Sequence, residues 1–245
     1  MKKRRRRRSP AARIRPFWMP LVFCAAVVLG ALGVAATWPG FNPKHVAVTG
    51  NHRVGSGEIL AHAAINPRVS IWLQNTRAIE ARVGTIPYID RAAVHRIPPA
   101  SIVIVVTERA PFATLRSGDD AAVVDRKMRV LTLDTPDEQL PELVIDPGAN
   151  LVPGAFVGTH QALALRDAYD AVTERGIVPT QLSLDRFGGL VVTMRGGLRL
   201  LFGSESDMSG KVRLAQAILA QVVGHEPRVA AVDLRAPAAP VLVYR

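Results

Sequence analysis

The sequence predicts a membrane-anchored α+β protein in three parts. These are an N-terminal transmembrane helix, a small unit of order strand–helix–helix–strand–strand, and a mixed or antiparallel β unit with two helices. Three observations lead to this class. Residues 17–38 are an uncharged apolar run, residues 44–109 alternate between strand and helix patterns, and residues 110–245 hold many short strand-like segments and two amphipathic ones. Helices set beside a sheet in that order are typical of α+β folds.

The apolar run "FWMPLVFCAAVVLGALGVAATW" at 17–38 predicts a membrane anchor. As a helix it rises about 33 Å, which matches the hydrocarbon core of a bilayer. Trp18 and Trp38 flank the run, where indole rings favour the two membrane interfaces. The flanking basic charge is all N-terminal, so the N-terminus is predicted in the cytoplasm and the remainder outside the inner membrane. A cleaved signal peptide and a lipoprotein signal at Cys24 are alternatives, but the run exceeds the usual 7–15 residues of a signal core.

The net charge of +11 first suggests a nucleic-acid partner. Residues 1–16 hold nine of the 31 Lys and Arg and no acid, which leaves 22 bases against 20 acids in the remainder. The basic character therefore belongs to a disordered cytoplasmic tail that sets topology near acidic lipid, and no nucleic acid is expected. Cys24 is the single cysteine, so a disulfide framework and a cysteine metal cluster are excluded.

After a linker at 39–43, residues 44–109 predict the small unit. "HVAVTGN" reads as a strand that ends in a turn, and Ser56 is the expected N-cap of a helix through "EILAHAA". "TRAIEARVGTI" has the apolar spacing of a second helix. "YIDRAAVHR" and "SIVIVVTER" predict two strands, and the second is expected to be central because apolar residues occupy both of its faces.

Residues 110–245 predict the β unit. "AAVVDRKMRVL" indicates a hairpin, and "QLSLDRFGGLVVTMRGGLRLLFG" indicates three strands separated by Gly-Gly turns. "VAAVDLR" and "APVLVYR" predict two final strands. Two helices are expected, with buried positions Leu163, Ala164, Ala168 and Val172 in "HQALALRDAYDAVTERG" and Val212, Ala215, Leu219 and Val222 in "DMSGKVRLAQAILAQVVG".

Catalytic and cofactor motifs are missing from the sequence. The six histidines never take a metal-binding spacing, and Gly55-Ser56-Gly57 lacks the flanking pattern of a nucleophile elbow. The acids Asp134, Asp137 and Glu138 share a proline-containing loop, where carboxylates are ordinarily solvated. We therefore expect no enzyme, no cofactor and no metal.

The last strand is the strongest candidate for a binding site. A strand without a successor is a candidate sheet edge, and Pro240 at its start suits an edge because a missing N–H costs little there. The segment that follows comprises Val241, Leu242, Val243, Tyr244 and Arg245. It is able to accept a strand from a partner. The other interpretation is a strand that completes the sheet beneath a covering helix.

Residues 44–109 resemble a POTRA (polypeptide-transport-associated) domain of the type found in the FtsQ/DivIB family of cell-division proteins. The resemblance is carried by "VAVTGNHRV" with "GEI" at 46–59, and by "IPYIDRAAVHRIPPASIVIVVTERAPFA" at 86–113, behind a basic tail and a single anchor. "VDRKMRV" and "LPEL" are similar to segments of the family's β domain. Met128, however, stands where the family has a turn glycine, which leaves the geometry of that turn open.

The resemblance implies a non-enzymatic, single-pass component of the divisome at the septum, which binds bitopic proteins of the FtsB/FtsL type. FtsK/FtsW-type partners and self-association are further expectations. The family's partner contacts imply a site at residues 240–245 and an arginine on an earlier strand, for which Arg186 matches best. The alternatives are an anchored POTRA-bearing protein for outer-membrane protein assembly or secretion, and an anchored periplasmic enzyme.

Overall fold

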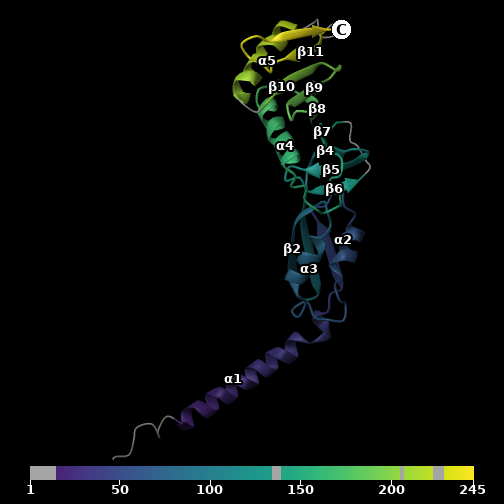
Figure 1. Ribbon diagram of the computed structural model, residues 1–245. Coiled ribbons are helices and arrows are strands. Elements are labelled where there is room, and N and C mark those ends of the chain that lie inside the picture. The colour runs from purple at the N-terminus through teal and green to yellow at the C-terminus, as the bar shows by residue number, and fades with distance from the viewer. Residues whose placement is uncertain (1–14, 134–138, 205–206, 223–228) are drawn as a thin grey trace, which may run out of the picture. The chain divides into compact units, whose positions relative to one another are not determined.

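The computed structural model describes residues 15–133, 139–204, 207–222 and 229–245. The predicted basic tail lies outside these residues up to position 14, as does the acidic loop at 134–138. The chain divides into two compact units, one holding the residues up to Val83 with Arg91–Thr107, the other Gly84–Asp90 with Glu108–Arg245 (Figure 1). The predicted α+β class is confirmed.

Helix α1 (Arg15–Ala36) forms the apolar run. Its segment Trp18–Ala36 is the one helix, among the described residues, that is long and apolar enough to cross a membrane. Nearly all of its described side chains are exposed, Trp18 among them. A short 3-10 helix, η2 (Pro39–Phe41), follows, with Trp38 as its N-cap.

The small unit has the predicted order β1 (His45–Thr49), α2 (Ser56–Ala63), α3 (Thr76–Val83), β2 (Ile89–Ile97) and β3 (Ser101–Glu108). Its sheet has the order β1-β3-β2, with β1 parallel to β3, so the strand predicted to be central is central. Ile102 and Ile104 of β3 are buried, as are Ile59 of α2 and Ile79 of α3. The other face of β3 is more open, since Val105 is partly exposed.

The predicted role of Ser56 is wrong. Helix α2 begins at Ser56, its N-cap is Gly55, and no side chain caps it. The hydroxyl of Ser56 instead accepts a hydrogen bond of 3.1 Å from Nδ2 of Asn51, which ties the β1 turn to the helix. The turn itself requires Gly50, because its φ is +84° and an added Cβ would lie 2.2 Å from the carbonyl oxygen of Val106.

The β unit is a nine-stranded mixed sheet of order β12-β11-β10-β9-β8-β7-β4-β5-β6. Its elements are β4 (Pro111–Ser117), β5 (Asp120–Asp125), β6 (Val130–Leu133), β7 (Glu142–Ile145), α4 (His160–Thr173), β8 (Pro179–Leu184), β9 (Leu190–Met194), β10 (Arg199–Gly203), α5 (Met208–Val222), β11 (Val229–Asp233) and β12 (Val241–Tyr244). β4 and β7 were not predicted. The two final strands, β11 and β12, and the three strands separated by Gly-Gly turns, β8, β9 and β10, were predicted.

The two helices of this unit are crossovers between parallel strands. α4 joins β7 to β8 and α5 joins β10 to β11, each pair being parallel. A parallel pair needs such a crossover because its strands run in the same direction. The helices contact each other as well as the sheet, so they cover the same face. That arrangement leaves strands from distant parts of the sequence in one continuous sheet (Figure 1).

The predicted buried stripe of α4 is shifted. The fully buried positions of this helix are Ala162, Leu165 and Val172, while Leu163 and Ala168 are only partly buried. Its N-cap is Thr159, whose hydroxyl accepts a hydrogen bond from the amide of Ala162. In α5 the predicted Val212 and Ala215 are buried and Leu219 packs beside them; the side chain of Val222 lies outside the described part.

Met128 has the positive φ that is typical of a turn glycine. It lies between β5 and β6 with φ of +62°, and its side chain is fully buried in the core of the β unit. The Oδ1 atom of Asp125 accepts hydrogen bonds of 2.8 Å from the amides of Lys127 and Arg129, which fixes the turn. Met128 therefore places a core side chain at a left-handed backbone position.

Two buried basic side chains are matched to acceptors. Nη1 of Arg109 lies 2.8 Å from Oδ2 of Asp125 and 3.0 Å from Oδ1 of Asp90. Lys211 of α5 is 2% exposed, and its Nζ donates to the carbonyl oxygens of Phe202 and Ser204 at 2.8 Å each. Buried charges persist only where such partners replace water, so both side chains belong to the framework of the compact unit that comprises Gly84–Asp90 and Glu108–Arg245.

Candidate docking site on the β unit

Strand β12 forms an edge of the nine-stranded sheet. It pairs with β11 alone, antiparallel, from Val229 opposite Tyr244 to Asp233 opposite Val241. All four of its residues are exposed, with Tyr244 at 63% and Leu242 at 37% the extremes. Since neighbouring side chains of a strand point to opposite faces, neither face of β12 is covered by the described residues.

This edge carries the protective residues of natural sheet edges only at its two ends. Edge strands commonly carry charges, prolines or bulges that prevent pairing with another chain. Here Pro240 and Arg245 stand at the two ends, and the four residues between them are apolar or aromatic. The outward N–H and C=O groups of β12 are thus available beside apolar side chains on both faces, which is the surface that strand addition requires.

The far end of β12 is tied to the neighbouring hairpin. Nη2 of Arg245 donates a hydrogen bond of 2.8 Å to the carbonyl oxygen of Gly196, in the turn between β9 and β10. Gly196 and Gly197 both have positive φ, as a tight hairpin turn requires. Arg245 therefore holds the last residues of the chain against the sheet while the β12 side chains stay exposed.

Arg186 is not on a strand, contrary to the expectation. It lies in the turn between β8 and β9, with its guanidinium 4.7 Å from the ring centre of Phe187. Phe187 is 79% exposed, and it is not among the site residues predicted from the sequence. Its signal was an aromatic residue at the tip of a hairpin turn, between a cation and two glycines.

The strand directions separate Arg186 from Tyr244. β9 is antiparallel to β8 and β10, β11 is parallel to β10, and β12 is antiparallel to β11. The Arg186 turn consequently lies at the end of the sheet where β12 begins with Val241, and Tyr244 lies at the opposite end. Two strands, β10 and β11, lie between the β8–β9 hairpin that carries this turn and β12. The structure therefore divides the predicted site residues into two groups.

Hydrogen bonds at the Arg186 end of the sheet lower the pKa of two carboxyl groups. The amides of Gly189 and Phe187 donate to Oδ1 of Asp185 at 2.8 Å and lower the pKa of this carboxyl. The pKa of Asp233 is also lowered, because Nε of Arg235 donates to its carboxylate at 2.9 Å. Hydrogen bonds to the charged form stabilise it, so this end of the sheet keeps fixed charges at neutral pH.

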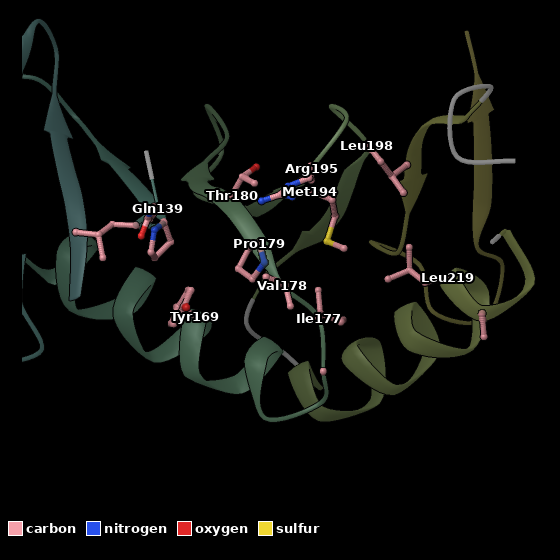
Figure 2. A pocket seen from close by; sticks show the side chains of 14 residues that line it. Gln139, Tyr169, Ile177, Val178, Pro179, Thr180, Met194, Arg195, Leu198 and Leu219 are labelled. Carbon is pink, nitrogen blue, oxygen red and sulfur yellow. The ribbon is translucent and has the colours of Figure 1, made fainter. Parts of the chain in front are cut away.

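A groove of about 980 Å³ opens where α4 and α5 meet the strands (Figure 2). Tyr169 of α4 and Leu219 of α5 line it on the helix side, and Pro179 and Met194 on the strand side. Its described lining includes one phenol and the guanidinium of Arg195 but no acid, histidine or cysteine. Groups for acid–base or metal chemistry therefore do not converge on this groove.

Metal ligands do not gather elsewhere in the described part of the chain, where no group of three His, Cys, Asp or Glu side chains is suitably placed.

The predicted membrane-interface residues Trp18 and Trp38 are both exposed.

Two family models match the chain. Residues 41–109 match the FtsQ-type POTRA domain, and residues 113–235 match the C-terminal domain of the cell division protein FtsQ/DivIB. The chain belongs to the FtsQ/DivIB family. This is a family of division proteins of the scaffold type and not a known enzyme family.

Relatives come from several bacteria. The chain is 27% identical to the cell division protein FtsQ of Mycolicibacterium smegmatis over 83% of its own length and 59% of that protein. It is 23% identical to FtsQ of Corynebacterium glutamicum, over 81% of the chain and 88% of the relative. Identity to FtsQ of Streptomyces coelicolor is 25%, over 88% of both chains. The chain thus spans less than two thirds of the M. smegmatis protein and most of the other two.

Proposed function

We propose that this chain is a single-pass protein of the cytoplasmic membrane that acts in division by binding other proteins. In this proposal residues 1–16 lie in the cytoplasm, α1 spans the inner membrane, and the POTRA-like domain (44–109) and β domain (110–245) lie in the periplasm at the septum. Family membership supports the division role. The length and apolarity of α1, with basic residues on its N-terminal side, support the topology.

The proposed partners are bitopic division proteins of the FtsB/FtsL type. The observation that carries this proposal is β12, an apolar edge strand exposed on both faces. A partner segment paired with β12 would become the next strand of the sheet. Its main-chain hydrogen bonds would supply affinity, and Val241 and Val243 on one face with Leu242 and Tyr244 on the other would supply specificity. Tyr244 is the proposed anchor, since aromatic side chains dominate interface energetics.

Arg186 and Phe187 form a second proposed contact. They lie at the Val241 end of the sheet, so a partner that pairs with β12 reaches them only by extending past the start of β12 and across β11 and β10. An exposed aromatic ring with a stacked guanidinium is the composition of many interface hot spots. Loss of the Phe187 ring should therefore weaken a long partner more than a short one that covers β12 alone.

Strand addition is tested by proline substitutions in the full-length chain in membranes. Neighbouring residues of an edge strand point their N–H groups in opposite directions, one toward β11 and one outward. Of Leu242→Pro and Val243→Pro, one removes a hydrogen bond to the partner and the other disturbs the bond to β11. Capture of an FtsB-type partner should weaken about tenfold for the outward position, the equivalent of about 1–1.5 kcal/mol.

Val243→Thr is the matched control, because it keeps the branched side chain and the N–H. Deletion of residues 240–245 should abolish capture. Unchanged capture after this deletion would refute the docking site. If the chain captures FtsK/FtsW-type proteins or a second copy of itself in place of an FtsB-type partner, β12 is the binding site for those proteins. Crosslinking of a Tyr244→Cys variant would identify them.

The division role has its own test. A fluorescent fusion should concentrate at the septum of dividing cells, whereas an even distribution along the envelope would contradict the role. A hydrolase activity of the purified chain that a single side-chain change abolishes would contradict the binding mechanism.

A further inference from the structure

We propose that Trp72 and Leu73, on the loop between α2 and α3, insert into the surface of the membrane that holds α1. This loop, residues 66–75, is called the tryptophan loop below. The inference rests on the proposed function in one respect, that α1 spans a membrane. It goes beyond that function because it assigns a lipid contact to the POTRA-like domain itself.

The tryptophan loop is fastened to the residues that follow α1. The amide of Ile71 donates a hydrogen bond of 2.8 Å to the carbonyl oxygen of Phe41. The ring of Phe41 lies edge-on to Trp72 at 6.3 Å and to Trp38 at 5.8 Å between ring centres. Three aromatic rings thus run from the end of the anchor to the tip of the loop.

Chain length keeps this cluster close to the bilayer. Phe41 is five residues beyond Ala36, where α1 ends. Five extended residues reach at most about 18 Å, and the η2 helix between Pro39 and Phe41 shortens that reach. The headgroup region on each side of the hydrocarbon core is about 5–8 Å thick. The short connection therefore keeps Phe41, and Trp72 in contact with it, within reach of the headgroups, whatever the direction of α1.

Hydrogen bonds fix the backbone of the tryptophan loop, and the fixed backbone leaves Trp72 and Leu73 exposed. Nε2 of Gln74 donates to the carbonyl oxygens of Asn66 at 2.6 Å and Val69 at 2.9 Å, closing the loop from inside. The guanidinium of Arg96 donates to the carbonyl oxygens of Ile71 and Gln74 at 2.6 and 2.7 Å. These bonds hold the backbone on both sides of the tip.

Ser70, Ile71 and Gln74 point inward and are buried, which turns the two residues between them outward. Trp72 is 47% exposed and Leu73 is 55% exposed. The closed loop therefore presents an ordered apolar surface to solvent. Because this surface is already ordered, little conformational entropy is lost when it binds.

Composition favours lipid as the occupant. Residues 37–47 and 64–78 together contain Lys44, Arg68 and Arg77 but no Asp or Glu. Indole rings favour the membrane interface, and nearby cations are attracted to anionic headgroups. An aromatic surface without acidic residues, beside a membrane span, has the composition of the span's own interface, and this favours lipid as its occupant.

The test uses depth-dependent quenching in vesicles of phosphatidylglycerol and phosphatidylethanolamine. The chain contains Trp18, Trp38 and Trp72 as its three tryptophans, so Trp18→Phe with Trp38→Phe leaves Trp72 alone. Emission of Trp72 should fall by about half with lipids brominated near the headgroup and should shift to shorter wavelength, as for an interfacial indole.

The matched control moves the single tryptophan to Val105 in a Trp-free background. This residue is 39% exposed, and it lies toward the end of β3 opposite to Ser101, which is at the anchor end because β1 and β3 are parallel. Its emission should be unaffected by the brominated lipids. Equal quenching at positions 72 and 105 would overturn the assignment of the contact to the tryptophan loop.

A second control separates this inference from the proposed anchor. With Trp18 as the single tryptophan, quenching by brominated lipid reports insertion of α1. If Trp18 is quenched and Trp72 is not, the anchor stands and the lipid contact is refuted. If Trp18 is not quenched, the proposed topology itself fails. A blue shift of Trp72 without lipid quenching would mean that protein covers the loop, which also overturns the inference.

Discussion

Met128 combines a buried side chain with a backbone conformation that favours glycine, so its replacement sets two contributions to stability against each other. Its side chain is 0% exposed in the core of the β unit, and its φ is +62°. The amide donates to the carbonyl oxygen of Asp125 and its own carbonyl accepts from Val157, both at 2.8 Å. The turn is thus held from both sides, and replacements should keep its geometry.

The magnitudes follow from these two features. Removal of a buried methionine side chain to alanine costs about 2–5 kcal/mol. A side chain at a left-handed position costs roughly 1–2 kcal/mol, which glycine does not incur. Met128→Ala should therefore lower the free energy of unfolding by about 2–5 kcal/mol. Met128→Gly should be about 1 kcal/mol more stable than Met128→Ala but still less stable than the unchanged chain.

The measurement must report on the β unit. Tryptophan emission does not, because all three tryptophans lie at or before position 72. Pulse proteolysis in increasing urea, with the fragments of the β unit read by mass, gives the midpoint directly. Gly188→Ala is the control for strain alone, since Gly188 has φ of +79° and open space around its Cβ position. The loss in free energy of unfolding caused by Gly188→Ala should match the difference in free energy of unfolding between Met128→Gly and Met128→Ala.

Two results would refute the reasoning. If the glycine variant is no more stable than the alanine variant, the turn does not strain a side chain. If the glycine variant is more stable than the unchanged chain, burial of the methionine does not outweigh the backbone cost.

Two further predictions concern charged groups. Arg109→Ala should destabilise the β unit by about 3–5 kcal/mol, because it leaves the buried carboxylate of Asp125 without its ion pair. The same proteolysis assay measures this loss, and a loss below about 1 kcal/mol, as for an exposed pair, would contradict it. The pKa of Asp185 is lowered by the amides of Gly189 and Phe187. Its contribution to the turn is complete above the unfolded pKa of about 3.9 and is lost as pH falls through the lower folded value. Carboxyl NMR titration should find that lower value, and a midpoint at or above about 3.9 would contradict the turn geometry.

Local patterns were enough to predict most individual elements. The β3 segment carries apolar residues on both faces and is central in its sheet, and the Gly-Gly pairs at 188–189 and 196–197 separate the strands as expected. β7 was missed because "ELVI" is only four residues long and gives little periodicity. The stripe of α4 was shifted because the helix contacts β7, β8 and α5 at once, which buries more than one face.

The candidate site could be predicted only in part from the sequence. A final apolar strand after Pro240 indicated an edge, and β12 is an edge. The exposure of both its faces depends on where α5 lies, which no local pattern encodes. Phe187 and the tryptophan loop were missed because an exposed aromatic residue has the same sequence signature as a buried one.

The sequence by itself determined the apolar helix, most of the strand and helix segments and the family resemblance, because these depend on residue spacing over short distances. Tertiary structure alone decided which strands neighbour each other, since parallel pairs such as β7 with β8 join segments about forty residues apart. That pairing sets Arg186 and Tyr244 at opposite ends of the sheet. It is also the contact of Phe41 with Trp72, across thirty residues of chain, that brings an exposed tryptophan close to the end of α1.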